Sequence, residues 1–163
     1  MKHFSKFRSL LLAAVLCVAG AAFAAPKHAQ EEDLVPILTF KTSIYDQYQE
    51  ANNFSIVLGV TDTTYLYVDC GNGVSEYEVG RATMDSASVS GTLIYCSVTE
   101  AGTVTIYGTE ADALLVDYLN ADGCYITDIN LGKLVNLDVL SLCHNSLTSL
   151  DLSRNTKIRA LYL

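Results

Sequence analysis

Four polar side chains near the C-terminus could form a hydrolytic site. Ser141 and His144 are close in sequence, and Asp138 and Asp151 flank them. A serine becomes a nucleophile when a histidine takes its proton and a carboxylate orients that histidine. No nucleophile elbow of the G-x-S-x-G type surrounds Ser141, and the leucine pattern of this stretch explains these positions better. We therefore expect no catalytic residue here and a non-enzymatic protein.

The cysteines and one glycine-rich turn are further candidates for chemistry. Cys70, Cys96, Cys124 and Cys143 follow one another at spacings of 26, 28 and 19, without a C-x-x-C pair, which indicates no zinc module. Cys70 and Cys96 could form a disulfide if their strands are neighbours or face each other, or could remain buried thiols. Residues 71–73 (Gly-Asn-Gly) are typical of a turn rather than a phosphate loop, because no helix-forming segment follows. Neither a metal nor a cofactor is expected.

The leucines of the C-terminal part form a 21-residue repeat. Residues 116–136 align with residues 137–157, and a third copy begins at Ile158. The second copy matches L-x-x-L-x-L-x-x-N/C-x-L in full, which is the pattern of leucine-rich repeats. Asn145 holds the N/C position, where the first copy has Cys124. In such repeats the leucines point inward and the N/C residue is structural, so Cys124 should point inward and Cys143 outward.

The other positions of the repeat strands predict a recognition surface. Side chains alternate across a strand, so the x residues should face solvent on the concave side of a stacked solenoid. The predicted partner-binding face consists of Tyr118, Asn120, Asp122, Val139, Ser141, Cys143, His144, Ala160 and Tyr162. Tyr118 and Tyr162 are plausible contact residues because tyrosine offers a large amphipathic area, although tyrosine is also favoured in strands for packing alone.

A second unit, residues 37–112, precedes the repeats and has the pattern of β-strands. Apolar residues alternate with polar ones over residues 54–60, 66–70 and 94–98. Several short strands predict a sandwich or partial barrel, whereas residues 44–51 fit either a loop or a single helical turn. Asn72-Gly73 is a strong hairpin signal, since type I′ turns need positive φ at both central residues.

Two roles are open for this β domain. It could cap the first repeat, because the terminal turn of a solenoid needs a unit that covers its apolar edge. It could instead bind sugar through an exposed aromatic strip of Tyr65, Tyr67 and Tyr77, or these residues could form cross-strand pairs only.

The N-terminus has the pattern of a secretory signal peptide. Basic residues, an apolar run over residues 10–19 and Ala22-Phe23-Ala24 fill its three regions, so the mature chain should begin at Ala25 and enter a linker over residues 25–36. The apolar run is short for a membrane anchor. Cleavage would take the formal charge from −8 to about −11, and clustered Lys and Arg are not found after the leader, so nucleic acid is excluded as a partner.

The order of these parts resembles secreted bacterial leucine-rich repeat proteins. The quoted stretches are residues 68–73 (VDCGNG), 90–93 (SGTL) and 103–108 (TVTIYG), followed directly by the repeats. Members often have Trp and Asp where this chain has Cys70 and Asn72, so no cation site is expected at that turn. The resemblance implies a surface or secreted protein that acts in adhesion or protein binding. Polysaccharide binding, or a targeting or substrate-docking role in a longer secreted enzyme, is the alternative.

The expected fold is mainly β. A signal peptide (1–24) and a linker (25–36) precede a small β-sandwich or partial barrel (37–112) and a right-handed leucine-rich repeat solenoid (113–163). The solenoid has about two repeats and stops at Leu163 within the third, whereas at least about three are normally needed. We therefore expect a fragment of a longer protein.

Overall fold

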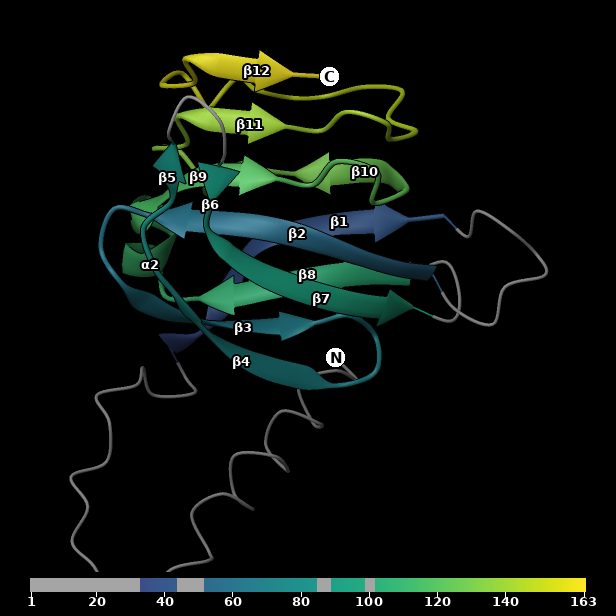
Figure 1. Cartoon of the computed structure of the whole chain (residues 1–163), viewed down its shortest axis with the longest axis horizontal. Coiled ribbons are helices and arrows are strands. Elements are labelled where there is room, and N and C mark those ends of the chain that lie inside the picture. Colours follow the sequence, from purple (N-terminus) through teal and green to yellow (C-terminus); the bar gives the residue numbers. More distant parts are fainter. Residues whose placement is uncertain (1–32, 44–51, 85–88, 99–101) are drawn as a thin grey trace, which may run out of the picture.

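The computed structural model describes residues 33–43, 52–84, 89–98 and 102–163, and these residues form a mainly β fold. The predicted signal peptide, most of the predicted linker and residues 44–51 lie outside the described residues. Two five-stranded sheets face each other, and a two-stranded ribbon lies beside them (Figure 1). The prediction of a mainly β chain is confirmed.

The first sheet is antiparallel throughout and has the order β10-β1-β8-β3-β4. Its strands are β10 (Ile126–Asn130), β1 (Val35–Thr42), β8 (Gly102–Gly108), β3 (Thr64–Asp69) and β4 (Val74–Val79). Phe40 of β1 lies opposite Ile129 of β10, so a strand of the repeat region completes the sheet of the preceding unit. β1 begins inside the segment that the sequence predicted as a linker.

The second sheet has the order β12-β11-β9-β2-β7 and mixes both pairing directions. Its strands are β12 (Ala160–Tyr162), β11 (Val139–Ser141), β9 (Val116–Asn120), β2 (Asn52–Val60) and β7 (Thr92–Val98). β9 is antiparallel to β2 and parallel to β11. Both sheets therefore continue across the boundary predicted at residue 112. The two-stranded ribbon pairs β5 (Thr83–Met84) with β6 (Val89–Ser90).

The three parallel strands are in register at the 21-residue step of the sequence repeat. Leu119 lies beside Leu140, and Leu140 lies beside Leu161. The turns between the strands repeat as well: the N–H of Leu134 donates to the carbonyl of Leu131, and the N–H of Asn155 donates to that of Leu152. The repeat in the sequence is thus also a repeat in the backbone.

One apolar core lies between the sheets and extends into the repeats. In β7 the apolar Ile94, Cys96 and Val98 are buried, whereas Leu93 and Tyr95 are exposed, as the alternation of a half-buried strand requires. The repeats add leucines that are almost completely buried: Leu119, Leu131, Leu134, Leu137 and Leu140. Each such side chain contributes about 1.5–3 kcal/mol, so the repeats and the sandwich stabilise each other.

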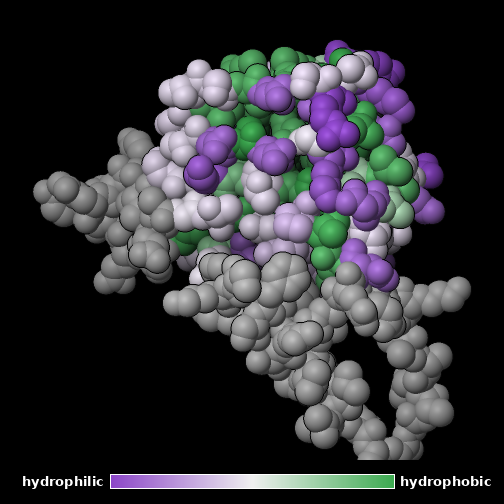
Figure 2. All heavy atoms as spheres, turned by 180° about the vertical axis from the view of Figure 1, so that it is seen from behind, coloured by the Kyte–Doolittle hydropathy of each residue, from purple (hydrophilic) through white to green (hydrophobic). Residues whose placement is uncertain are grey.

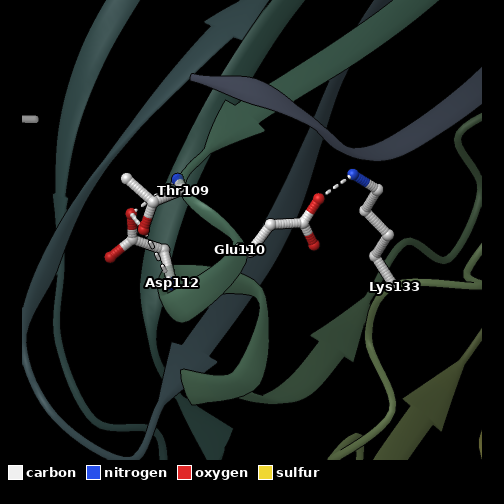
Figure 3. Close-up of polar contacts among 4 residues, drawn as sticks. All are labelled: Thr109, Glu110, Asp112 and Lys133. Atoms are coloured by element: carbon white, nitrogen blue, oxygen red, sulfur yellow. Dashed lines mark hydrogen bonds and ion pairs between the residues drawn. The ribbon is translucent and has the colours of Figure 1, made fainter. Parts of the chain in front are cut away.

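A short helix, α2 (Glu110–Leu115), leads from β8 in the first sheet to β9 in the second. Thr109 caps it: the Thr109 Oγ accepts from the N–H of Asp112 at 3.1 Å, and an Asp112 carboxylate oxygen accepts from the N–H of Thr109 at 2.7 Å. Figure 3 shows this capping box beside the ion pair between Glu110 and Lys133. The hydroxyl of Thr64 also donates to Asp112 and ties the cap to β3. The box fixes the point at which the chain changes sheets.

The hairpin expected at Asn72-Gly73 joins β3 and β4, but its turn is not of type I′. Asp69 pairs with Val74, so residues 70–73 form the loop. Positive φ occurs at Gly71 (96°) and Gly73 (125°), not at Asn72. The loop is longer than the two-residue turn that the type I′ prediction required.

Among the described residues, no helix has the length and apolar composition of a membrane span.

Candidate functional site

The predicted partner-binding face lies along the three parallel strands, but three of its residues are buried. Tyr118, Val139 and Ser141 expose only 5%, 7% and 6% of their surface, so the prediction that they face solvent is wrong. The other six residues are half-buried or exposed: Asn120, Asp122, Cys143, His144, Ala160 and Tyr162. We call these six residues the outer-strand face.

Tyr118 is buried, and another segment approaches its strand pair. Ala82, just before β5, lies close to Gly59, the partner of Tyr118 in β2: a Cβ atom at Gly59 would overlap Ala82 and would lie 3.0 Å from the Cβ of Tyr118. Burial raises the pKa of the Tyr118 hydroxyl, and a side-chain hydrogen bond with Asn120 partly offsets the rise. Val139 is buried as well, and it lies between Tyr118 of β9 and Ala160 of β12 in the sheet. Tyr118 is thus a packing residue.

Asp122 holds the ends of two neighbouring strands together. One of its carboxylate oxygens accepts hydrogen bonds from the Ser141 hydroxyl and from the N–H of Cys143, both at 2.7 Å. The other oxygen accepts from the Asn120 side-chain amide at 3.2 Å. Hydrogen bonds to a charged acceptor are stronger than neutral ones. Asp122 therefore fixes the geometry of the outer-strand face where β9 and β11 end.

The exposed part of this region is apolar at one end. The large apolar residues with the most exposed surface there are Leu161 (42%), Tyr162 (52%) and Leu163 (70%). Figure 2, which views the molecule from behind, shows hydrophobic atoms along part of the upper margin, the end at which β12 lies in Figure 1. Tyr162 combines this apolar edge with a hydroxyl group that can reach polar partners.

The residues that suggested a hydrolytic site are engaged separately. The Ser141 hydroxyl donates to Asp122. Asp138 pairs with Arg159, and this hydrogen bond lowers the pKa of the Asp138 carboxyl. Asp151 accepts from the N–H of Ser153 at 2.9 Å, and His144 is exposed on a turn with φ of 57°. Ser141, Asp138 and Asp151 are thus bonded to partners other than His144.

The four cysteines of the described region have different environments. The sulfur atoms of Cys70 and Cys96 are bonded, which joins the end of β3 in the first sheet to β7 in the second. Cys124 is a buried free thiol whose pKa is raised to about 12, mainly by desolvation and further by the charge of Asp122. Cys143 is free and half-buried. A thiol that stays protonated is a poor nucleophile, so Cys124 is a packing residue.

Asn145 completes the backbone hydrogen bonds of the preceding repeat. Its side-chain oxygen accepts from the N–H groups of Cys124 at 3.1 Å and Ile126 at 2.9 Å. Its amide nitrogen donates to the carbonyls of Ala121 at 2.8 Å and Leu142 at 2.9 Å. Buried backbone groups need such partners. The structure thus places Asn145 in the role predicted for the N/C column.

The predicted aromatic strip of Tyr65, Tyr67 and Tyr77 does not form. Leu66 of β3 lies opposite Tyr77 of β4, so Tyr77 shares a sheet face with Leu66, whereas Tyr65 and Tyr67 lie on the other face. Tyr67 is only 8% exposed, and its hydroxyl donates to Glu76 at 3.0 Å. Burial and this hydrogen bond raise the pKa of Tyr67 to about 12. Sugar binding through the three tyrosines together is therefore excluded.

A pocket of about 430 Å³ lies beside the disulfide, where the β3–β4 hairpin meets the edge strand β7. Phe54, Val68 and the two bonded cysteines line its apolar part. Its polar part includes Asn53, Ser55, Asn72, Ser75, Tyr77 and Tyr95. The sequence did not predict this pocket. The alternation in β7 shows that Tyr95 points away from the core, but nothing in the sequence shows that the β3–β4 hairpin lies beside it.

No protein-family model, curated protein or solved structure matches the chain. The inference of function therefore rests on the outer-strand face and the edge pocket.

Proposed function

We propose that this protein is a non-enzymatic binding module built on a leucine-rich repeat solenoid, and that it recognises a protein ligand through the outer-strand face. The observation that carries the proposal is the register of β9, β11 and β12, in which each strand follows its neighbour at the 21-residue step of the sequence. Stacked repeats of this kind bind partners through the extended surface that their strands form.

Repeated hydrogen bonds support the solenoid part of the proposal. Asn130 accepts from the N–H of Gly132 at 3.0 Å, and Asp151 accepts from the N–H of Ser153 at 2.9 Å. These two turns occupy equivalent positions of successive copies. Together with the reach of Asn145 into the preceding copy, they indicate that each copy builds the same turn. The pairing of β9 with β2 supports the role of the sandwich as a cap for the first repeat.

The chemistry of the face supports a protein as the ligand. Tyr162 is half exposed, and Ala160 beside it leaves room for an approaching side chain. His144 and Asp122 add polar groups at the same end of the strands. An aromatic anchor with a polar surround is the usual composition of a protein interface.

A secreted location is part of the same proposal. The pattern of residues 1–24 supports export, and the disulfide between Cys70 and Cys96 supports an oxidising destination, since such bonds persist outside the cytosol. Sequencing the N-terminus of the protein recovered after export tests this part, and Ala25 is the expected first residue.

The binding proposal is tested by measuring retention of the exported chain on immobilised fibronectin, laminin and collagen. Two variants alter the face without touching the core: Tyr162→Ala removes the anchor, and Ala160→Glu places a charge beside it. Each should weaken binding to the retained protein by about tenfold or more, as expected for anchor residues. Tyr95→Ala, which alters another exposed tyrosine (69%, against 52% for Tyr162) at the opposite edge of the sheet, is the matched control. Retention on none of the three proteins, or equal losses in all variants, would contradict the proposal.

A further inference from the structure

We infer that the pocket beside the Cys70–Cys96 disulfide binds a neutral polysaccharide chain. The pocket lies at β7, whereas the outer-strand face lies at β9, β11 and β12, toward the opposite edge of the same sheet. The site is therefore separate from the proposed protein-binding face, and of the three tyrosines that the sequence suggested it includes Tyr77 alone.

The absence of charge in the lining favours an uncharged, polar ligand. None of the twelve lining residues is charged, and seven of them carry a neutral amide or hydroxyl group. This neutrality is local, because the chain has 18 acidic residues and Glu76 and Glu78 flank Tyr77 in β4. A charged ligand would lose hydration here without gaining a counter-charge. A ligand rich in uncharged hydroxyl groups matches the amides and hydroxyls instead.

Two tyrosines supply the surface on which a sugar ring can stack. Tyr95 is 69% exposed on β7, and the hydroxyl of Tyr77 reaches the carbonyl of Tyr95 at 3.5 Å across the mouth of the pocket. The electron-rich face of an aromatic ring attracts the C–H bonds on the flat face of a sugar. The amide of Asn72 donates to the carbonyl of Ser97 at 3.4 Å. Both contacts are long, so these polar groups can turn toward ligand hydroxyls at small cost.

The pocket is held open before a ligand arrives. The disulfide joins its two walls, one from the end of β3 and the other from β7. Fixed walls reduce the ordering cost of binding. Its volume of about 430 Å³ lies within the range of small-molecule sites, and its exposed rim at Asn53, Asn72 and Tyr95 leaves the sides open. An internal stretch of a polymer can therefore lie across it.

Calorimetric titration of the mature chain tests this inference. The neutral probes are cellohexaose, xylohexaose and mannohexaose, and hexagalacturonic acid is the anionic comparison. At least one neutral probe should bind, and the anionic probe should not. Tyr95→Ala should weaken that binding by about tenfold or more, whereas Tyr95→Phe, which keeps the ring, should retain most of it. Tyr162→Ala should leave it unchanged, because that residue lies on the outer-strand face.

Three results would overturn the inference: no binding of any neutral probe at millimolar concentration, equal binding of hexagalacturonic acid, or unchanged binding by Tyr95→Ala. Far-ultraviolet circular dichroism of each variant confirms that the fold is kept, as expected for an exposed residue. Failure here leaves the protein-binding proposal intact, because that proposal is tested with variants of Tyr162 and Ala160.

Discussion

The side-chain nitrogen of Asn145 lies 2.8 Å from the carbonyl oxygen of Ala121, in the preceding repeat. The same side chain also accepts hydrogen bonds from two N–H groups of that repeat. A single asparagine therefore supplies backbone partners that the turn after β9 cannot supply for itself.

Replacing this side chain should destabilise the protein strongly. Asn145→Ala removes partners from Cys124, Ile126 and Ala121 and leaves their backbone groups buried, so we expect a loss of about 2–4 kcal/mol in the free energy of unfolding. Urea unfolding followed by circular dichroism measures the change. Ser146→Ala, at the exposed neighbouring position, should stay within about 0.5 kcal/mol. Equal effects of the two substitutions would show that the amide has no special role.

The capping box of α2 should matter more than the ion pair beside it. Thr109→Ala removes the acceptor for the N–H of Asp112 and should cost about 1 kcal/mol. Lys133→Met breaks the pair with Glu110, whose side chain is 70% exposed, and should cost less than about 0.5 kcal/mol. Both are measured by thermal unfolding at matched concentration. If Lys133→Met destabilised the protein more than Thr109→Ala, the ion pair would matter more than the capping box, contrary to this prediction.

Asp117 and Asp138 occupy equivalent positions of the 21-residue repeat, but they should affect the pH dependence of the free energy of unfolding in opposite directions. Desolvation, and to a smaller extent the charge of Asp138, raises the pKa of Asp117, against opposing contributions from its own backbone and Arg81. A raised carboxyl pKa means that ionisation costs stability, so Asp117→Asn should match the wild type at low pH and become the more stable protein as pH rises through the folded pKa.

Asp138→Asn is the sign-reversed control for that experiment. The hydrogen bond from Arg159 lowers the pKa of Asp138, so its ionised form stabilises the fold above the unfolded pKa, and this contribution is lost as pH falls through the folded pKa. Asp138→Asn should therefore be the less stable protein at neutral pH and should match the wild type in acid. Urea unfolding at about pH 3, 5 and 7 separates the two curves. Curves of the same sign would mean that the two carboxylates do not differ as described.

The two free cysteines of the described residues, Cys124 and Cys143, should differ in reactivity. The pKa of Cys124, raised to about 12, keeps that buried thiol protonated at pH near 8, whereas Cys143 is half-buried. Iodoacetamide should modify Cys143 first in the folded protein and both residues after unfolding, as peptide mass spectrometry can show. In the chain without the predicted signal peptide, which contains Cys17, Cys143→Ser should abolish the modification of the folded protein. Modification of Cys124 at the rate of Cys143 without unfolding would contradict its burial.

Local patterns in the sequence account for much of this fold. The spacing of Leu119, Leu140 and Leu161 predicts which residues stack, because a stacked repeat places equivalent positions side by side. The alternation in β7 likewise predicts its buried face. The capping box was also visible as Thr109 followed three residues later by Asp112, although we did not predict a helix there.

Contacts between distant segments account for what the sequence did not predict. Tyr118 is buried in a strand pair whose Gly59 is closely approached by Ala82, and no local rule links Ala82 to that pair. β10 pairs with β1, although the two strands are separated by more than half the chain. The change in sequence pattern indicated a domain boundary at residue 112, but both sheets contain strands from either side of it. The edge pocket arises in the same way, since its walls come from β2, β3, β4 and β7.

β9 is bonded on one side to the antiparallel β2 and on the other to the parallel β11. It is the strand at which the second sheet changes from antiparallel to parallel pairing, so both of its edges are hydrogen-bonded. Strands paired on both edges open less readily than edge strands, so the amides of β9 should exchange more slowly than those of β7, which is paired on one edge within the described residues.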